Sequence, residues 1–307
     1  MFRPRIGVLF SRIRTEEKWV FSALEARGIP YERLDDSSTI FDYAHPESWQ
    51  RYDAVLIRSL SYARGLYAAR YLNQFGIPTV NMAHVAEICG DKLVTTGHLT
   101  QANIPQPRSL MAFDPESAMA AIETLGYPVV LKPVVGSWGR LLAKINDVEA
   151  AEAILEHKNS LGSYQHSIFC VQEYVPKPGR DIRAYVIGNE TVCAIYRNSP
   201  HWITNTARGG RSEICPVTDE LNELCVRAAQ AVGGGMLGID VIEHPEKGLL
   251  INEINHTTEF HNAAPTTGVD LPGMLVDYML EVAGGDWNGR QQQMRYPVIP
   301  EPQYAVA

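Results

Sequence analysis

The sequence predicts a mixed α/β protein, with α+β character in its later parts, and three patterns predict it. Short apolar runs alternate with helical patterns over residues 1–88, as in a parallel sheet covered by helices. Further along, two pairs of apolar runs flank short turn segments, which is typical of antiparallel hairpins. A chain of 307 residues is also long enough for two or three subdomains rather than one core.

Residues 1–88 are predicted to form an N-terminal domain. Glycines at positions 28 and 76 mark the ends of its two helices. The alternation resembles a Rossmann-like half-domain, but G-x-G-x-x-G is absent, so we assign no dinucleotide to it. The expected strands are Ile6–Phe10, Tyr31–Leu34, Ala54–Ile57 and Pro78–Asn81, and the expected helices are Glu16–Arg27 and Leu66–Phe75.

Residues 89–178 are predicted to form a second unit that carries a glycine-containing loop. Its helices are expected at Lys92–Ala102, Pro115–Leu125 and Val148–Leu155. Its strands are expected at Val129–Pro133, Leu141–Ile145 and Ile168–Tyr174, with the loop Gly136–Arg140 between the first two. Pro176, Pro178 and Gly179 then interrupt the chain, as a hinge between subdomains would.

Residues 179–285 are predicted to form a third unit that is richer in β-structure. One hairpin is expected to pair Ile182–Ile187 with Thr191–Arg197, and another to pair Ile239–Ile242 with Leu249–Ile254. Helices are expected at Glu220–Val232 and Pro272–Val282. The tail 286–307, with three consecutive glutamines and several prolines, is predicted to be weakly ordered.

Composition narrows the class of protein. A net charge of −8 argues against a nucleic-acid binder held by a broad basic surface. No apolar run approaches the roughly 18–20 residues needed to cross a bilayer, and the apolar run near the N-terminus is too short for a signal peptide. We therefore expect a cytoplasmic protein without a membrane or nucleic-acid partner. The five cysteines include no C-x-x-C pair and are interpreted as reduced, buried thiols.

Three oxygen-bearing side chains form the sharpest functional pattern. Glu253 and Asn255 are two apart on a predicted strand and so share a face. Folding the hairpin at His244–Gly248 brings Asp240 close to Glu253, within a residue of register. Carboxylate and amide oxygens without nitrogen or sulfur donors suit Mg²⁺. The alternative is an exposed polar strand face, but the flanking apolar residues favour a metal site.

A second pattern points to phosphate binding. Lys132 follows a buried apolar strand, and the loop Gly136–Arg140 contains two glycines that let backbone N–H groups approach an anion. Together they suggest a triphosphate clamp, although G-K-[ST] is absent and this is no Walker A loop. The alternative is a plain turn beside a surface lysine.

Two weaker patterns accompany these. The strand Val171–Val175 ends at the hinge, where backbone groups and Glu173 could meet a purine, although an ordinary strand end explains it as well. Arginines after the hinge could bind carboxylates or phosphates bidentately, with Trp202–Gly210 supplying further donors. The alternative is solvated surface arginine, favoured for Arg211 but not for Arg183. These arginines are Arg180, Arg183, Arg197, Arg208 and Arg211.

The order of these motifs resembles the ATP-grasp superfamily, and within it the RimK-like ligases, from about residue 5 to 283. The resemblance implies that nucleotide is held between two α+β subdomains behind a pre-ATP-grasp domain. The motifs, in chain order, are Asp91-Lys92, Leu131–Pro133, Gly136–Arg140, Gln172–Val175, Asp181–Arg183, Asn205–Gly210, Gly238–Asp240 and Asn252–Asn255.

Two longer stretches, Val135–Lys144 and Asn252–Phe260 with Thr266–Pro272, resemble the LysX type, the α-aminoadipate–LysW ligases. That family joins the α-amino group of α-aminoadipate to the γ-carboxylate of the C-terminal glutamate of a small acidic carrier protein. The resemblance implies an acyl phosphate intermediate, ATP, two Mg²⁺ ions and release of ADP and phosphate. The arginines could supply a landing zone for the acidic carrier. The sister ArgX type uses glutamate as the amine.

The resemblance also implies a role for each matching residue. Lys92 and Lys132 would contact ATP phosphates, and Ser137, Trp138, Gly139 and Arg140 would form a mobile loop over them. Gln172, Glu173, Tyr174 and Val175 would surround adenine, with Asp181 near the ribose. Arg183, Arg197 and Asn205 would be catalytic, and Asp240, Glu253 and Asn255 would bind the metal. The residues implied near the amine substrate are Arg197, His256, Thr257, Glu259 and Phe260.

Two other interpretations remain open at this point. One is a RimK-like ligase that adds free glutamate to a different peptide or small acid. The other is a non-catalytic ATP-binding module on the same fold, which would be expected to have lost a metal ligand or a phosphate lysine. All five such residues are present here: Lys92, Lys132, Asp240, Glu253 and Asn255. From the family we also expect a homodimer or homotetramer.

Overall fold

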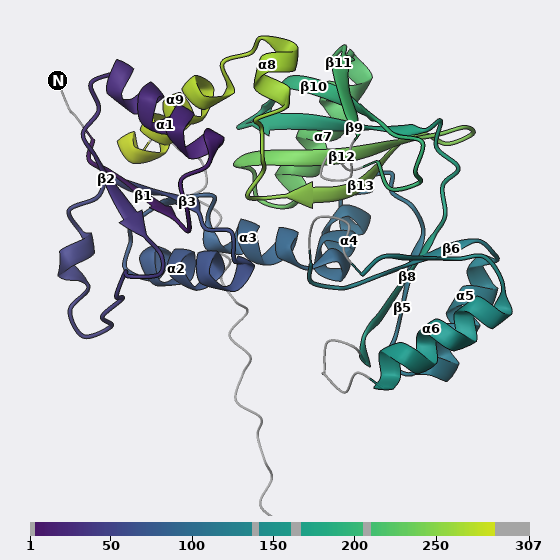
Figure 1. Cartoon of the computed structure of the whole chain (residues 1–307). Helices are drawn as coiled ribbons and strands as arrows, with labels where there is room; N and C mark the ends of the chain where they lie inside the picture. The colour runs from purple at the N-terminus through teal and green to yellow at the C-terminus, as the bar shows by residue number, and fades with distance from the viewer. Residues whose placement is uncertain (1–3, 137–140, 161–166, 205–209, 286–307) are drawn as a thin grey trace, which may run out of the picture.

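The computed structural model describes residues 4–136, 141–160, 167–204 and 210–285, which form three sheets in chain order (Figure 1). The predicted α/β class is confirmed. The sites predicted at Ser137, Trp138, Gly139, Arg140 and Asn205, together with Arg208 and the tail 286–307, lie outside the described residues. No helix in the described ranges is both long and apolar enough to cross a membrane.

The first sheet is parallel, with strand order β2-β1-β3-β4. Every residue of its two central strands, β1 and β3, is buried, because helices cover both faces. Helices α1 and α9 lie side by side over one face although they come from opposite ends of the described chain (Figure 1). The elements are β1 (Ile6–Phe10), α1 (Thr15–Ala26), β2 (Tyr31–Asp35), η1 (Pro46–Trp49), β3 (Ala54–Arg58), α2 (Tyr62–Gln74), β4 (Thr79–Val80) and α9 (Leu271–Gly284).

The second sheet is antiparallel, with strand order β5-β8-β6-β7. Two helices cover one face and enclose a separate apolar core (Figure 1). The elements are β5 (Ser109–Ala112), α5 (Pro115–Leu125), β6 (Val129–Lys132), β7 (Ala143–Ile145), α6 (Val148–Ser160) and β8 (Phe169–Glu173).

The third sheet is antiparallel, with strand order β11-β10-β9-β12-β13. Helices α3, α4 and α7 pack against one face, where Val85, Ile88 and Leu99 join its core. The helix predicted at Lys92–Ala102 therefore packs under this sheet rather than with the second sheet. The elements are α3 (Ala83–Gly90), α4 (Lys92–Gln101), β9 (Arg180–Ile187), β10 (Glu190–Asn198), β11 (Arg211–Cys215), α7 (Asp219–Ala231), β12 (Met236–His244), β13 (Gly248–Asn255) and α8 (Ala263–Thr267).

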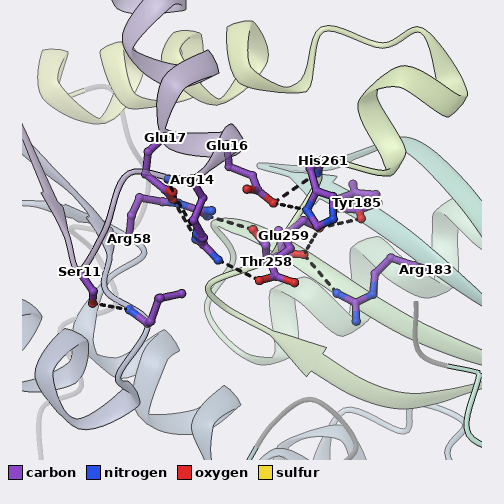
Figure 2. A network of polar contacts seen from close by, with 11 residues as sticks. Ser11, Arg14, Glu16, Glu17, Arg58, Arg183, Tyr185, Thr258, Glu259 and His261 are labelled. Carbon is purple, nitrogen blue, oxygen red and sulfur yellow. Dashed lines mark hydrogen bonds and ion pairs between the residues drawn. The ribbon is translucent and has the colours of Figure 1, made fainter. Parts of the chain in front are cut away.

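The first and third sheets are joined by one apolar core and by buried charges. Phe260 is fully buried in this core, and its ring stacks on Trp19 with centroids 6.4 Å apart. Beside them, Arg58 Nε lies 3.0 Å from Glu17 Oε1, and Arg58 Nη1 donates to the backbone oxygen of Thr258 at 3.0 Å (Figure 2). Burial opposes the charge on Glu17, but the hydrogen bond from Arg14 and the charges of Arg58 and Arg14 lower its pKa to about 2.

Replacing Arg58 by methionine is expected to lower the free energy of unfolding by about 3–5 kcal/mol. The variant would leave the Glu17 carboxylate buried with Arg14 alone and would remove a donor from Thr258. Urea denaturation would measure the change. Arg70→Met is the control, since Arg70 pairs with Glu87 where the two side chains are 40% and 48% exposed, and such surface pairs contribute at most about 1 kcal/mol. Equal losses in the two variants would contradict this account of the interface.

Candidate active site

Three charged residues stand in one row across the third sheet. Arg183 on β9 is paired with Asp240 on β12, and Asp240 is paired with Glu253 on β13. Residues directly opposite one another in antiparallel strands point to the same face. Glu253 and Asp240 therefore meet as the sequence predicted, and they do so on the face opposite α7.

A bulge in β13 sets this register. Counting from His244, which pairs with Gly248, a regular hairpin would place Asn252 opposite Asp240. The register shifts between Asp240 and Val241, so that Glu253 takes that place instead. The extra residue, Asn252, accepts a hydrogen bond from Lys132 Nζ at 2.9 Å. The bulge thus positions both side chains, a common use of bulges near active sites.

Two arginines hold Asp240. Arg183 binds it through Nε and through Nη2, the latter 3.1 Å from Oδ2, and Arg197 Nη2 lies 3.0 Å from Oδ1. Asp240 is only 5% exposed, so these cations offset the cost of burying its charge. Gly238 makes room for this arrangement, because a Cβ there would lie 2.2 Å from Thr258 Oγ1 and 2.9 Å from Arg183 Nη1.

Two lysines contact the neighbouring residues of β13, Glu253 and Asn252. Lys92 Nζ lies 3.2 Å from Glu253 Oε1 and donates to the backbone oxygen of Gly136 at 2.7 Å. Burial favours the neutral acid at Glu253, but the charges of Lys92 and Lys132 hold its pKa below the ordinary value. Desolvation lowers the pKa of Lys132 to about 8 despite Glu253 nearby. Lysine and arginine side chains therefore surround the carboxylates of Asp240 and Glu253.

A cavity of about 830 Å³, partly open to solvent, lies between the second and third sheets. The chain thus gathers residues predicted from distant motifs around one space. The predicted site residues that line it are Lys92, Lys132, Gln172, Glu173, Tyr174, Val175, Asp181, Arg197, Asp240 and Glu253.

The end of β8 forms one wall of this first cavity. Gln172 is buried and donates through Nε2 to Ser109 Oγ at 3.1 Å. Glu173 accepts from the backbone nitrogen of Arg108 at 2.9 Å and from Lys247 Nζ at 3.0 Å. The ring of Tyr174 lies under Lys144 Nζ, 3.8 Å from its centroid. These residues lie where a base could be held, but Lys247 already neutralises the carboxylate predicted to meet adenine.

A buried cluster of charges occupies another wall. Arg197 binds Asp181 through Nε–Oδ1 at 2.7 Å and Nη2–Oδ2 at 2.8 Å. Lys177 Nζ lies 3.5 Å from the same carboxylate and donates to Thr204 Oγ1 at 2.7 Å. Burial opposes the charge of Asp181, but Arg197 and Lys177 lower its pKa. The carboxylate predicted to face a ribose is therefore fully engaged by protein.

A second cavity, of about 740 Å³ with its space open to solvent included, adjoins the first and shares Gly136 and Glu253 with it. Asn255, His256, Thr257 and Glu259 line it, as expected for residues predicted near a substrate. Desolvation lowers the pKa of His256 to about 4, so its ring is neutral at pH 7. Its other wall comes from the N-terminal domain, through Arg14, Ser59, Leu60 and Tyr62.

Three predicted roles do not fit this arrangement. Phe260 lines neither cavity, because its side chain fills the apolar core between the first and third sheets. Arg197 lies in the first cavity rather than beside the second, with both edges of its guanidinium bound to aspartates. Arg183 lines neither cavity and lies behind Asp240, where Nη1 also donates to Thr258 Oγ1 at 3.2 Å (Figure 2). Its observed contacts position Asp240.

Several lining residues were not predicted. No local pattern in the sequence marks Asn252 or Lys177 as part of the site. The position of Asn252 depends on a bulge, and Lys177 stands between two prolines. Arg14 and Ser59 belong to a domain for which the sequence predicted no ligand. The only sign of them in the sequence is their place in the chain, because each follows a strand of the parallel sheet. Ligands commonly bind at the edge of the sheet where such strands end.

Comparison with known families accounts for this succession of motifs and cavities. Residues 6–88 match the LysX preATP-grasp domain, and residues 89–279 match the RimK-like ATP-grasp domain. The chain belongs to the RimK-like ATP-grasp family. It is therefore a ligase of the ATP-grasp type, as the sequence predicted, and the resemblance to the LysX type is confirmed.

Individual ATP-grasp relatives cover nearly the whole chain. The glutamate–LysW ligase ArgX of Sulfurisphaera tokodaii is 36% identical and covers 90% of this chain and 98% of its own. The α-aminoadipate–LysW ligase LysX of the same organism is 34% identical, with 88% and 96% covered. The crystal structure of a RimK domain ATP-grasp protein from Sphaerobacter thermophilus superposes with a TM-score of 0.77 at 29% identity, covering 90% of this chain and 99% of its own.

ATP-grasp ligases use ATP and Mg²⁺, and the residues present fit such an ion. Asp240 and Glu253 pair across β12 and β13, and the Glu253 side chain lies at the junction of the two cavities. Among the described residues, no three His, Cys, Asp or Glu side chains gather closely enough to hold a metal. The predicted ligands are two carboxylates and the Asn255 amide, a hard oxygen set of the kind that suits Mg²⁺.

Proposed function

We propose that this chain joins the α-amino group of α-aminoadipate to the γ-carboxylate of the C-terminal glutamate of a LysW-type carrier protein. The family and the names of its relatives support an ATP-dependent amide ligase that acts with LysW. The observation that carries the proposal is the junction of two cavities at Glu253 and Gly136. One cavity suits the nucleotide and the other the amine, so the acyl group can react where they meet.

The chemistry follows from what each side chain can do at that junction. The carrier carboxylate attacks the γ-phosphorus of ATP, the new O–P bond forms, and the bond to ADP breaks. Lys92 and Lys132 stabilise the terminal phosphate. Asp240, Glu253 and Asn255 would hold Mg²⁺, which would supply positive charge to the phosphates. Arg183 and Arg197 hold the Asp240 carboxylate in place.

The free amine then attacks the acyl carbon, a C–N bond forms, the C–O bond to the phosphate breaks, and phosphate leaves. The proton that the amino nitrogen loses passes to the departing phosphate, and the reaction needs no covalent enzyme intermediate. Water that reaches the acyl phosphate would hydrolyse it, so the amine must compete with water for the acyl carbon.

Glutamate is the second candidate for the amine, because the ArgX relative is as similar to this chain as the LysX relative. The two amino acids differ by one methylene group, which a pocket discriminates by only about 1–3 kcal/mol. The carrier and the activation step would be unchanged.

The test incubates the enzyme with ATP, Mg²⁺ and a LysW-type carrier, with either α-aminoadipate or glutamate as amine. We expect the mass of the carrier to rise by one α-aminoadipyl group. A carrier that lacks its terminal glutamate is the control and should not change. A rise with glutamate alone would replace the first candidate by the second, and no rise with either amine would contradict the proposal.

A further inference from the structure

One wall of the second cavity comes from the N-terminal domain, and the proposed activation of ATP uses no residue of this wall. Arg14 follows β1, and Ser59 directly follows β3. The two strands are parallel neighbours, so their carboxyl ends meet at one edge of the sheet. Open α/β sheets bind ligands at that edge. The first sheet therefore presents Arg14 and Ser59 together to whatever enters the cavity.

Arg14 is a cation that the protein holds rigidly. Its Nε and Nη2 bind the two oxygens of Glu17 at 3.0 and 2.9 Å, and Glu17 is itself fixed by Arg58 (Figure 2). That leaves the Nη1 side of the guanidinium for the cavity. Among the described residues that line the cavity, Arg14 is the one lysine or arginine. A negative ligand group would find its partner here.

Ser59 supplies an independent sign of a ligand. The residue is 4% exposed, and its hydroxyl oxygen has no hydrogen-bond partner among the described residues. A buried hydroxyl without a partner costs about 1–3 kcal/mol, so proteins rarely keep one without a use. Because Ser59 lines the same cavity as Arg14, a bound carboxylate could accept from both groups.

Glu259 occupies the Nη1 side of Arg14 in this structure. Its Oε1 lies 2.8 Å from Arg14 Nη1, and its side chain is 38% exposed (Figure 2). A carboxylate of the protein thus stands where a carboxylate of a ligand would bind, and it can turn toward solvent when displaced. This arrangement matches Arg14 to a carboxylate rather than to a neutral group.

We propose that Arg14 and Ser59 bind the side-chain carboxylate of the amine substrate and displace Glu259 from Arg14. This inference rests on the proposed function, which requires an amino acid in the second cavity. The amino group lies at the junction with the first cavity, by Glu253 and Gly136, and the second carboxylate lies at the N-terminal domain. Arg14 then selects amino dicarboxylic acids over their neutral analogues.

The experiment compares each dicarboxylic amine with the analogue whose side-chain carboxylate is an amide. Arg14→Gln is expected to lower kcat/KM for the dicarboxylic amine about 100-fold and for the amide analogue only a few-fold, since a hydrogen bond to a charged group contributes about 1.5–3 kcal/mol. Arg64→Gln, which changes an exposed arginine of the same domain, is the control and should alter neither. Equal losses for both amines in Arg14→Gln would overturn the inference.

Two further variants keep the test independent of folding, because Arg14→Gln also weakens the hold on Glu17. Ser59→Ala should lower kcat/KM for the dicarboxylic amine about 10-fold and leave the amide analogue unchanged; an unchanged preference would contradict a role for Ser59. Glu259→Gln removes the competing charge and should lower KM for the dicarboxylic amine several-fold. A higher KM would show that Glu259 binds the substrate directly instead of competing with it.

Failure of the inference and failure of the proposed function give different results. Normal amide formation with unaltered side-chain preference in Arg14→Gln would reject the subsite and keep the ligase. If the wild type forms no amide, calorimetric titration of α-aminoadipate and of glutamate with ADP and Mg²⁺ present decides the subsite alone. Binding that is lost in Arg14→Gln and Ser59→Ala would support it, and binding that is unchanged or absent would reject it.

Discussion

Replacing Glu253 by glutamine is expected to slow ADP release by about 1,000-fold while the protein stays folded. Glutamine keeps the size of the side chain but removes the charge that lies 3.2 Å from Lys92 at the junction of the two cavities. Loss of one preorganised group at a phosphoryl-transfer centre costs roughly 10²–10³ in rate, and a lost metal ligand adds to that. A coupled ADP assay measures the rate, and circular dichroism checks the fold.

Glu243→Gln is the matched control for this prediction. Glu243 also lies on the β12–β13 hairpin and also pairs with a cation, Arg180, at 2.7 Å. It lines neither of the two cavities. We expect a change of at most about two-fold in ADP release, because this partly exposed pair lies outside both cavities and such pairs contribute little. Near-normal turnover in Glu253→Gln would remove Glu253 from the proposed chemistry.

The oxygen cluster was predictable because its causes are local. Strand alternation places Glu253 and Asn255 on one face, and a short hairpin brings Asp240 beside them. The sequence left the register uncertain by one residue, since the bulge at Asn252 depends on how β13 packs. The same bulge sends Asn252 to Lys132, a contact between residues 120 positions apart that no local pattern contains.

The second cavity was only half predictable. Its 256–259 wall follows directly from β13, and a family resemblance was enough to indicate it. The opposite wall depends on the first sheet docking against the third, through contacts such as Arg14 to Glu259, 245 residues apart. The sequence showed a Rossmann-like pattern without its glycine signature and so predicted no ligand for that domain.

Burial explains the roles that sequence reasoning misplaced. The alternation of side chains along a strand shows which residues share a face of the sheet. It does not show which part of that face another domain covers. On β9 the face that carries Asp181 and Arg183 continues into Tyr185 and Ile187, which lie in the core under the N-terminal domain. Phe260 joins that core for the same reason. The short strands β5 and β11 were also missed, because edge strands with exposed residues such as Met111 and Ile214 show no clear apolar period.

Replacing Lys132 by methionine is expected to abolish ATP turnover and yet stabilise the free protein. Lys132 is 7% exposed, and desolvation lowers its pKa from 10.5 to about 8. At pH 7 the side chain is charged in both the folded and the unfolded chain, and the fold disfavours that charge by on the order of 3 kcal/mol. Losing the hydrogen bond to Asn252 offsets about 1 kcal/mol of this. A gain of about 1–3 kcal/mol should remain.

The pH dependence of this gain gives the sharper test. Below about pH 8, Lys132 is protonated in the folded protein, and the full free-energy cost of burying its charge lowers the stability of the wild type. Between about pH 8 and 10.5 the folded chain releases that proton while the unfolded chain still binds it, so wild-type stability rises relative to the variant. The difference in urea unfolding between Lys132→Met and wild type should therefore shrink over that range. The exposed Lys18, replaced likewise, should change stability by less than about 0.5 kcal/mol at any of these pH values. A Lys132→Met protein less stable than wild type at pH 7 would show that Lys132 supports the fold rather than straining it for the sake of phosphate binding.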